Sequence, residues 1–447
     1  MQLIVCIQRE VQSNGMVVLP SDSSYSVTPY FFDVVVVGAG PGGSTAANAL
    51  SRLGLKVAMV DRFSFPRDKA CGDVIGPKAR FLLAKTEVKV DAFVGIGDMD
   101  VVLPNDVRVH LPSAAGIDFD GVGGALPRYE FDNYLFEAAL NSGVEFIKGR
   151  VSLPIPSHSR DPYTVVVDDG HGPKTLLATY LIGADGANST VADKFNLIDR
   201  EKVLLGFAVR RYVRGVVRTP TISILGKSGS LFPGYGWVFP SMEGRLNVGV
   251  GVGVLNDRSK GSIATKTIES YLAIVRNTLA IEFQEDLDGS KETQMGGWLK
   301  MGMAGTTAGK YRVLLVGDAA GLVNPLQGEG IAQAIESGLL VAQAIQRSPR
   351  DPASFYRREL LDFDSNFRKG SSFIHRTAIQ YPKLSLAGVK ALGALAQSHR
   401  VASAWGIYFN ALNNSAGPIE GSLLARSGSS VLSVGEMITE TFTALRG

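Results

Sequence analysis

Residues 33–43 read DVVVVGAGPGG, and this stretch decides the fold. The run of valines up to Val37 predicts a buried strand, and the alanine-rich segment that continues to about Leu53 predicts a helix. A second apolar run follows and ends at Asp61. A strand, a Gly-x-Gly-x-x-Gly turn, a helix, a second strand and an acidic residue thus stand in the order of a dinucleotide-binding βαβ unit.

Each of the three glycines has a separate task in such a turn. Gly38 permits the tight turn, Gly40 lets the backbone approach a pyrophosphate, and Gly43 lets the helix pack closely on the strand. The phosphates then lie at the N-terminus of the helix. Asp61, 23 residues after Gly38, is placed to accept hydrogen bonds from the ribose of an adenosine. An acid rather than an arginine at this position disfavours a 2′-phosphate, so FAD or NAD is expected in preference to NADP.

Two later segments rich in glycine also follow predicted strands. Residues 181–189 read LIGADGANS, and residues 312–330 read RVLLVGDAAGLVNPLQGEG, before a helix predicted from Ile331 to about Ile345. An acid at a strand's end, here Asp318, can bind a sugar or ribityl hydroxyl. The glycines before Ile331 leave N–H groups and the positive end of the helix dipole for a delocalised anion such as a reduced flavin ring.

These motifs together resemble a known superfamily. With an Arg-x-x-Phe-Asp motif at residues 128–132, their order resembles that of FAD-dependent enzymes with the p-hydroxybenzoate hydroxylase fold. Within this superfamily, FPRDKACGD at residues 65–73 and GYGWVFP at residues 234–240 resemble the geranylgeranyl reductase family, including its menaquinone-reductase branch. The resemblance spans residues 33–345 and implies FAD as the cofactor.

The resemblance also implies a fold class and a division of the chain. The expected fold is α/β, with a Rossmann-like FAD-binding domain, an interleaved substrate domain built on an antiparallel β-sheet, and a helical C-terminal region. The expected segments are 33–96, 128–200 and 300–345 for the FAD-binding domain, 97–127 and 201–299 for the substrate domain, 346–447 for the C-terminal region, and 1–32 for an N-terminal extension.

Residue roles follow from the same resemblance. Asp61 and the three glycines of the first turn would hold the AMP and pyrophosphate half of FAD. Arg128 would reach the pyrophosphate or the ribityl chain, Asp318 would hold the ribityl chain, and Gly328 and Gly330 would face the pyrimidine edge of the flavin. The expected cofactor contacts are Gly38, Gly40, Gly43, Asp61, Arg62, Cys71, Gly72, Arg128, Asp185, Gly317, Asp318, Pro325, Gly328, Gly330 and Ile331.

Two residues are candidates for catalysis and three for contact with a substrate. The Cys-Gly pair that begins at Cys71 lies near the flavin in reductases of this family, although Cys71 also suits a small apolar position in a loop. Tyr235, or a water near Cys71, is a candidate proton source. Phe207, Trp237 and Phe239 are expected to line an apolar tunnel, with the core of the sheet as the alternative for some of these aromatic side chains.

Composition narrows the range of partners. Of the 447 residues, 45% are hydrophobic and 19% charged, and a net charge of +3 is too small to hold nucleic acid. Two cysteines and five scattered histidines predict no metal site. The arginine-rich stretch over residues 210–218 is expected to be a solvated strand face, with binding to an anionic headgroup or a membrane surface as the alternative. A hydrophobic small molecule or lipid is the expected substrate.

Residues 1–32 lack the basic n-region and the long h-region of a signal peptide. Other apolar runs are interrupted before the ~18 residues that a transmembrane helix needs. We therefore expect a cytoplasmic protein that is either free in solution or peripheral to a membrane.

The resemblance favours one activity and leaves others open. The leading hypothesis is an FAD-dependent oxidoreductase that saturates carbon–carbon double bonds of a polyisoprenoid chain by hydride transfer from reduced flavin. NAD(P)H or a ferredoxin-like protein would supply the electrons. The alternatives are an FAD-dependent monooxygenase acting on an aromatic or polyketide-type compound, a flavin-dependent halogenase, and a flavin-binding module without enzyme activity. The halogenase is disfavoured because the sequence lacks a Trp-x-Trp-x-Ile-Pro motif.

Overall fold

The computed structural model describes most of the chain between residues 29 and 395. Within that span it leaves out residues 87, 91, 112–121, 155–161, 227–231, 256–257, 285–293, 326 and 367–371. Nearly all of the expected N-terminal extension and the second half of the expected C-terminal helical region therefore lie outside the described residues.

The first of two large sheets is built around β1 (Tyr30–Val37), which runs parallel to both of its neighbours, β2 (Val57–Asp61) and β11 (Pro173–Gly183). The remaining strands of this sheet are β8 (Glu145–Lys148), β9 (Arg150–Ser152), β10 (Tyr163–Asp168), β18 (Gly309–Lys310) and β19 (Val313–Leu315). Val37 pairs with Gly183, and Gly183 with Leu315, so β1, β11 and β19 end at the same edge. The loops that follow these three strands meet there.

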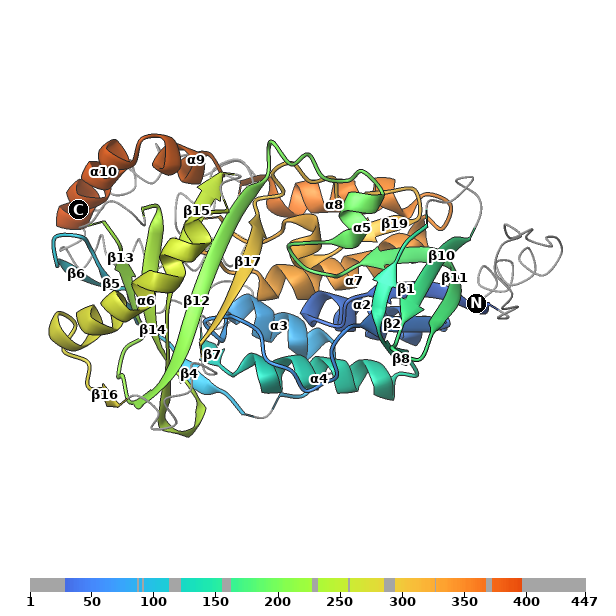
Figure 1. Ribbon diagram of the computed structural model, residues 1–447, viewed down its shortest axis with the longest axis horizontal. Helices are drawn as coiled ribbons and strands as arrows, with labels where there is room; N and C mark the ends of the chain where they lie inside the picture. The colour runs from blue at the N-terminus through green and yellow to red at the C-terminus, as the bar shows by residue number, and fades with distance from the viewer. Residues whose placement is uncertain are drawn as a thin grey trace, which may run out of the picture.

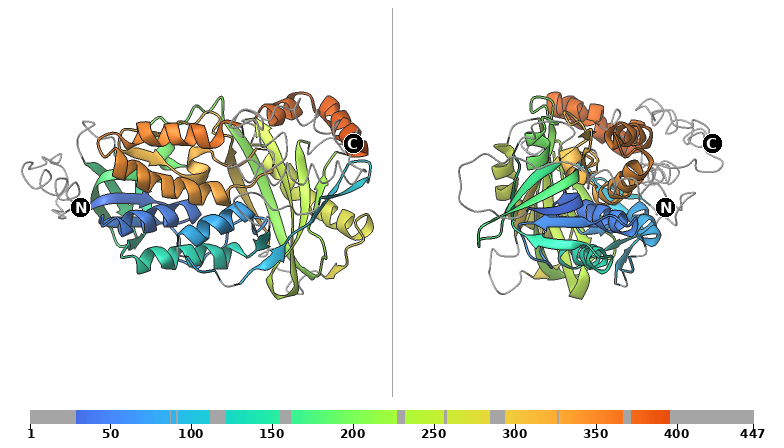
Figure 2. Two further views of the ribbon diagram at one scale, coloured as in Figure 1. Left: turned by 180° about the vertical axis from the view of Figure 1, so that it is seen from behind. Right: turned by 90° about the vertical axis from the view of Figure 1, so that its right-hand side faces the viewer.

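Helices cover this sheet and hold its loops in place (Figures 1 and 2). The helix α2 (Pro41–Arg52) packs between α4 (Arg128–Asn141) and α7 (Ile331–Arg347). On the outside of α7 lies α8 (Pro352–Asn366), whereas the short α5 (Thr190–Lys194) follows β11. The valines at the end of β1, residues 34–37, and the apolar residues 57–60 of β2 are almost fully buried, so this layer forms the main hydrophobic core.

The second large sheet is almost entirely antiparallel and stands at the other end of the molecule (Figure 1). Its strands are β5 (Met99–Val102), β6 (Arg108–Leu111), β12 (Leu204–Gly215), β13 (Thr221–Ile224), β14 (Gly234–Pro240), β15 (Arg245–Leu255), β16 (Phe283–Gln284) and β17 (Met295–Met301). The helix α6 (Lys260–Asn277) covers one face with buried Ile268, Tyr271 and Leu272. The opposite face of β12, β14 and β15 is left for contact with the first layer.

A small third sheet connects the two layers. It joins β3 (Val74–Ile75) and β4 (Val94–Ile96) to β7 (Gly123–Ala125), and α3 (Pro77–Lys85) follows β3. This sheet pairs strands from the expected FAD-binding segment 33–96 with β7 from the expected substrate segment 97–127. The strand β17 likewise continues across the boundary expected between residues 299 and 300.

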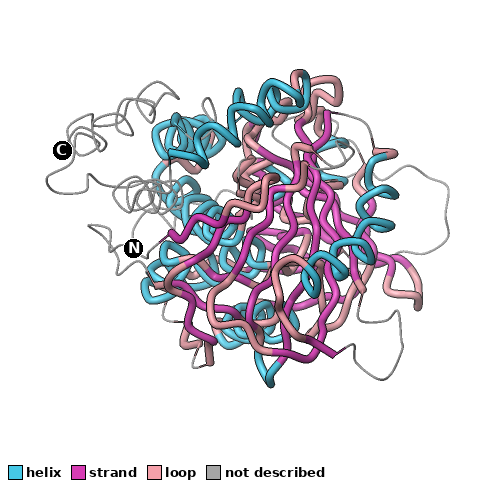
Figure 3. The backbone as a smooth tube through the Cα atoms, turned by 90° about the vertical axis from the view of Figure 1, so that its left-hand side faces the viewer, coloured by secondary structure: helices cyan, strands magenta, loops and turns pink. Residues whose placement is uncertain are grey.

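Two further helices pack at the end of the molecule that holds the second sheet (Figure 1). Viewed from that end, the strands have helices on both sides (Figure 3). The helix α9 (Ser372–Gln380) packs against β15, and α10 (Pro382–Leu395) packs against α9. None of the helices within the described ranges has an apolar stretch long enough to cross a bilayer.

Candidate active site

The glycine turn after β1 has the shape that a pyrophosphate needs. Gly38 has a φ of +106°, and a Cβ built on it would lie 2.2 Å from the carbonyl oxygen of Ala184. A Cβ on Gly43 would lie 1.9 Å from the carbonyl oxygen of Gly38, so neither position has room for a side chain. Gly40 differs, because a Cβ there would meet only the Arg67 guanidinium, at 3.4 Å. The first turn of α2 has no side-chain cap, which leaves its N–H groups facing this open space.

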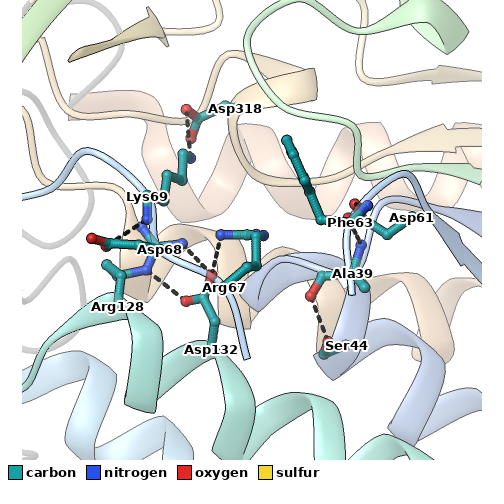
Figure 4. A network of polar contacts seen from close by, with 10 residues as sticks. All are labelled: Ala39, Ser44, Asp61, Phe63, Arg67, Asp68, Lys69, Arg128, Asp132 and Asp318. Carbon is teal, nitrogen blue, oxygen red and sulfur yellow. Dashed lines mark hydrogen bonds and ion pairs between the residues drawn. The ribbon is translucent and has the colours of Figure 1, made fainter. Parts of the chain in front are cut away.

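Asp61 lies at the end of β2 and is tied to the glycine turn (Figure 4). Its Oδ2 accepts a hydrogen bond from the Ala39 N–H at 2.9 Å, and its Oδ1 accepts one from the Phe63 N–H at 2.9 Å. Each carboxylate oxygen keeps a further lone pair for a ribose hydroxyl. The Arg62 guanidinium lies over the Phe63 ring, 4.7 Å from its centroid.

Arg67, which was not singled out from the sequence, lies beside the glycine turn and shares a carboxylate with Arg128. The Arg128 side chain makes two hydrogen bonds to Asp132, of 2.6 and 2.7 Å, and lies within hydrogen-bond reach of the Cys71 thiol. Arg67 Nη1 is 3.0 Å from Oδ2 of the same carboxylate (Figure 4). Asp132 is fully buried and thus holds both guanidinium groups, of which Arg67 is the one beside Gly40.

A second group of charges lies under the loops that follow β11 and β19. Asp185 Oδ2 accepts hydrogen bonds from the Thr190 and Val191 N–H groups and so caps α5, and burial raises the pKa of this carboxyl group. Its Oδ1 is buried and, like Oδ2 of Asp318, has no hydrogen-bond partner among the described residues. The Lys300 side chain comes from β17, is fully buried and faces both carboxylates, and burial lowers its pKa to about 8.

The unpaired carboxylate oxygens of Asp185 and Asp318 indicate that a polar ligand binds between the first and the second sheet. The Lys69 ammonium lies 3.8 Å from Asp318 Oδ2, which is too far for a hydrogen bond (Figure 4). Buried polar atoms normally have partners, so an unpaired carboxylate oxygen next to an open glycine turn needs one. The hydroxyls of a ribityl chain would supply it. The residues at this edge of the sheet therefore fit FAD.

The glycines before α7 are constrained by the protein itself. Gly330 is the N-cap of α7 without a side-chain cap, and a Cβ on it would lie 2.9 Å from Val323 Cγ2. Gly328 has a φ of +71°, and a Cβ there would lie 2.8 Å from the Tyr235 hydroxyl oxygen. Tyr235 donates that hydroxyl to the Gln327 carbonyl oxygen, and burial raises its pKa further above the ordinary value. Tyr235 thus fixes the loop in which Pro325, Gly328 and Gly330 stand.

The turn at Cys71 and Gly72 lies directly against the second sheet. A Cβ on Gly72 would meet the Phe239 ring at 3.1 Å and Trp237 Nε1 at 3.5 Å. Trp237 Nε1 donates to Asn247 Oδ1 at 2.9 Å, and the Trp237 and Phe239 rings are stacked with their centroids 6.4 Å apart. Burial raises the pKa of the Cys71 thiol, so it keeps its proton. Trp237 and Phe239 therefore form an aromatic wall beside this turn.

Phe207, expected with Trp237 and Phe239 to line a tunnel or else to belong to the core of the sheet, does not share this wall. Phe207 packs against Trp298 at 4.9 Å, and its ring lies 3.3 Å from the position of a Cβ on Gly261 in α6. Gly236, whose neighbours in β14 are Tyr235 and Trp237, also faces α6. Side chains alternate between the faces of a sheet, so Phe207 belongs to the α6 face and the aromatic wall to the opposite one.

The expectation of a solvated face for residues 210–218 fails at its first member. Arg210 is 1% exposed, pairs with Asp68 and lies over the Tyr212 ring, 4.1 Å from its centroid. Tyr212 in turn donates its hydroxyl to Asp73. Asn247 Nδ2 donates to Asp73 Oδ2 at 2.7 Å and to the Cys71 carbonyl oxygen at 2.8 Å. The alternation along β12 was the available signal, because Arg210 and Tyr212 stand at even positions, opposite in face to the buried Val209 and Val213.

Comparison with known proteins agrees with this geometry at the level of class. The model of the FAD binding domain family matches residues 123–354, and that of pyridine nucleotide-disulphide oxidoreductases matches residues 32–191. The chain is an FAD-dependent oxidoreductase. A solved structure of a geranylgeranyl bacteriochlorophyll reductase-like protein from Thermoplasma acidophilum covers 93% of this chain and all of its own, with a TM-score of 0.67 and 20% identity. The predicted p-hydroxybenzoate hydroxylase-like fold is confirmed.

Curated relatives give the family. A menaquinone reductase from Mycolicibacterium smegmatis is 33% identical over 70% of this chain and 75% of its own length. Digeranylgeranylglycerophospholipid reductase 1 from Methanopyrus kandleri is 29% identical over 79% of this chain and 92% of its own. The chain belongs to the geranylgeranyl reductase family, which includes the menaquinone reductases, as the motifs indicated.

Proposed function

We propose that this protein reduces carbon–carbon double bonds in the polyisoprenoid chain of a lipid or quinone. The names of its relatives, a menaquinone reductase and a digeranylgeranylglycerophospholipid reductase, support this substrate class. The observation that carries the proposal is the contact of the Cys71–Gly72 turn with the aromatic wall of Trp237 and Phe239. An apolar chain would lie against this wall at the place where the turn brings the cofactor.

The cofactor would bind along the edge where the three loops meet. We propose that Gly38, Gly40, Gly43 and Asp61 hold the AMP and pyrophosphate half, with the guanidinium of Arg67 on the pyrophosphate. Asp318, with Lys300 and Asp185 behind it, would hold the ribityl chain, and the loop from Pro325 to Ile331 would face the flavin ring. When bound and reduced, FAD supplies the hydride.

The reaction places two demands on the protein. An isolated trisubstituted alkene is a poor hydride acceptor, so a proton must arrive at one carbon as hydride arrives at the other. Water must also be kept away from the reacting atoms. The wall of Trp237 and Phe239 meets the second demand, and Cys71 would sit between the wall and the cofactor. Tyr235 is a poor proton source, because its hydroxyl is already donated to the Gln327 carbonyl oxygen.

The electron donor and the place of action complete the proposal. The sequence has no second Gly-x-Gly-x-x-Gly turn after a strand, so we propose that NAD(P)H visits the site transiently or that a ferredoxin-like protein delivers electrons. A polyisoprenoid substrate partitions into bilayers. Work at the cytoplasmic periphery of a membrane would bring the enzyme to it.

An anaerobic single-turnover experiment tests the proposal. The holoenzyme is reduced chemically under argon, mixed with a geranylgeranyl lipid or a menaquinone in detergent, and the product is weighed by mass spectrometry. We expect a product heavier by two hydrogen atoms for each saturated bond, and no product from enzyme left oxidised. A product that forms only in air and is heavier by one oxygen atom would refute the reductase activity and show a monooxygenase instead.

A further inference from the structure

A buried carboxylic acid that no known role accounts for lies directly behind the Cys71–Gly72 turn. Asp73 is 0% exposed and has a φ of +63°, a conformation that asparagine and aspartate adopt more readily than most residues. Its Oδ2 accepts hydrogen bonds from the Tyr212 hydroxyl and from Asn247 Nδ2. Its Oδ1 is buried without a hydrogen-bond partner in the described part of the chain. One oxygen of Asp73 thus has no partner, and the other is hydrogen-bonded to the Tyr212 hydroxyl. This arrangement allows a proton to pass between the two side chains.

The groups around Asp73 balance its two protonation states. Burial disfavours the carboxylate, whereas the hydrogen bonds from Tyr212 and Asn247 and the charges of Arg210 and Arg128 favour it. Cys71, on the same loop, is a thiol that burial keeps protonated. The result is a pKa of about 6 for Asp73, well above its ordinary value. An acid with a pKa near the operating pH transfers protons best.

Tyr212 is the member of this pair that reaches outward. Asp73 is fully enclosed, but Tyr212 on β12 is only partly buried. A hydroxyl can rotate, so the bond between the two residues can run in either direction. When Asp73 is protonated, its carboxyl O–H donates to the Tyr212 oxygen, and the Tyr212 hydrogen becomes free to point elsewhere.

We propose that Asp73 stores the proton that the alkene takes up and that Tyr212 passes it on, which rests on the proposed alkene reduction. One alkene carbon accepts hydride from reduced FAD, and the other accepts the hydroxyl proton of Tyr212. At the same time the carboxyl proton of Asp73 moves to the Tyr212 oxygen. The C=C π bond is lost and two C–H bonds form, so the alkene gains the two electrons that the cofactor loses. The Asp73 carboxylate that remains takes up a proton from water before the next turnover.

The first test observes Asp73 directly and needs no substrate. Difference infrared spectra of the purified holoenzyme between about pH 5 and about pH 8 should show the carbonyl band of a buried, protonated carboxyl group that titrates near pH 6. Asp73→Asn should lack this band. Tyr212→Phe should keep it but shift its midpoint to higher pH, because the carboxylate loses a stabilising hydrogen bond. Absence of the band, or its survival in Asp73→Asn, would overturn the proposal.

The second test measures the anaerobic rate of flavin reoxidation by an alkene as a function of pH. In the wild-type protein the rate should fall as the pH rises through about 6. Asp73→Asn and Tyr212→Phe should each lower kcat by about 10²-fold or more with KM unchanged, and Tyr212→Phe serves alone if Asp73→Asn does not fold. Asp106→Asn is the matched control, because Asp106 is exposed and has the same φ of +63°. Its pH profile should be that of the wild type.

The two tests separate this inference from the proposed function. If the wild-type protein saturates no alkene, the proposed function fails, while the infrared titration still decides whether Asp73 exchanges a proton near neutral pH. If the alkene is saturated and both variants keep the wild-type rate and pH profile, the proton comes from elsewhere and the inference is refuted.

Discussion

The two ends of the site are built in different ways. At the phosphate end, residues 33–61 form a single βαβ unit, and the contacts offered to a ligand are mostly backbone N–H groups. At the other end, the turn at residues 71–73 meets β12, β14 and β15, and the contacts are buried side chains with charges. The first end depends on the absence of side chains, and the second depends on their exact pairing. Substitutions at the phosphate end should therefore act through sterics and lost anchoring, and those at the other end through charge and proton exchange.

Gly43→Val should have the largest effect. The new side chain would overlap the Gly38 carbonyl oxygen, which a Cβ alone would approach to 1.9 Å. We expect loss of FAD binding and a fall in unfolding free energy of ~3 kcal/mol or more, measured by flavin fluorescence and chemical denaturation. Gly54→Ala is the control, because Gly54 has a φ of +84° but nothing within 4 Å of its Cβ position. It should cost only about 1 kcal/mol and retain FAD; equal losses in both variants would contradict the steric explanation.

Asp132→Ala should come next, because it removes the carboxylate that holds Arg128 and Arg67. Arg128 is almost fully buried and would be left without its partner. Breaking a buried ion pair costs ~3–5 kcal/mol, and release of Arg67 should also weaken FAD binding. Glu130→Ala, at an acid on the same helix that is not fully buried, is the control. Denaturation curves and FAD titrations measure both effects. Unchanged FAD affinity would show that Arg67 does not bind the pyrophosphate.

Asp73 should make the stability of the protein depend on pH in an unusual direction. Its pKa is about 6 in the folded protein against an ordinary 3.8, so folding stabilises the protonated form. This contribution is complete below about pH 4 and is lost as the pH rises through about 6, by up to ~3 kcal/mol for this one group. Asp73→Asn, which stays neutral, should therefore gain stability relative to wild type as the pH rises from about 4 to about 8. A constant difference over that range would show that Asp73 does not titrate there.

Cys71→Ala should have the smallest effect on stability and a visible effect on catalysis. Cys71 as a residue is half-buried, its thiol lies near Arg128, and the adjoining Gly72 meets the aromatic wall. If Cys71 faces the cofactor, the variant should change turnover by about 10-fold, or alter which double bonds are saturated, while its melting temperature and FAD content stay unchanged. Chromatography of the products after partial turnover measures this. Wild-type rates and products with several substrates would return Cys71 to the role of a small loop residue.

Much of the fold was predictable because its signals are local. The glycine turn, the acid at the end of β2 and the helix after Gly330 each lie within one short segment, and each has a pattern that sterics or the helix dipole imposes. The resemblance extended these patterns to a fold class and a family, both of which the comparisons confirm. It also identified the Cys71–Gly72 turn, which the structure places against Trp237 and Phe239.

Other residues were out of reach because their partners are distant in the chain. Tyr212 and Asn247 meet Asp73 across 139 and 174 residues, and Arg210 meets Asp68 across 142. In a sequence, Arg210 is one member of an arginine-rich stretch, and no local rule says that an ion pair will cover it.

What the sequence by itself determined is the backbone architecture of the phosphate end, the cofactor class and the family. Only the tertiary structure decided which side of β12 each residue faces, placing Phe207 against α6 and Tyr212 against Asp73. The physical reason is that a strand alternates its side chains between two faces, while the layer that covers each face comes from elsewhere in the chain. The charge of a buried acid such as Asp73 then depends on neighbours that folding alone brings to it.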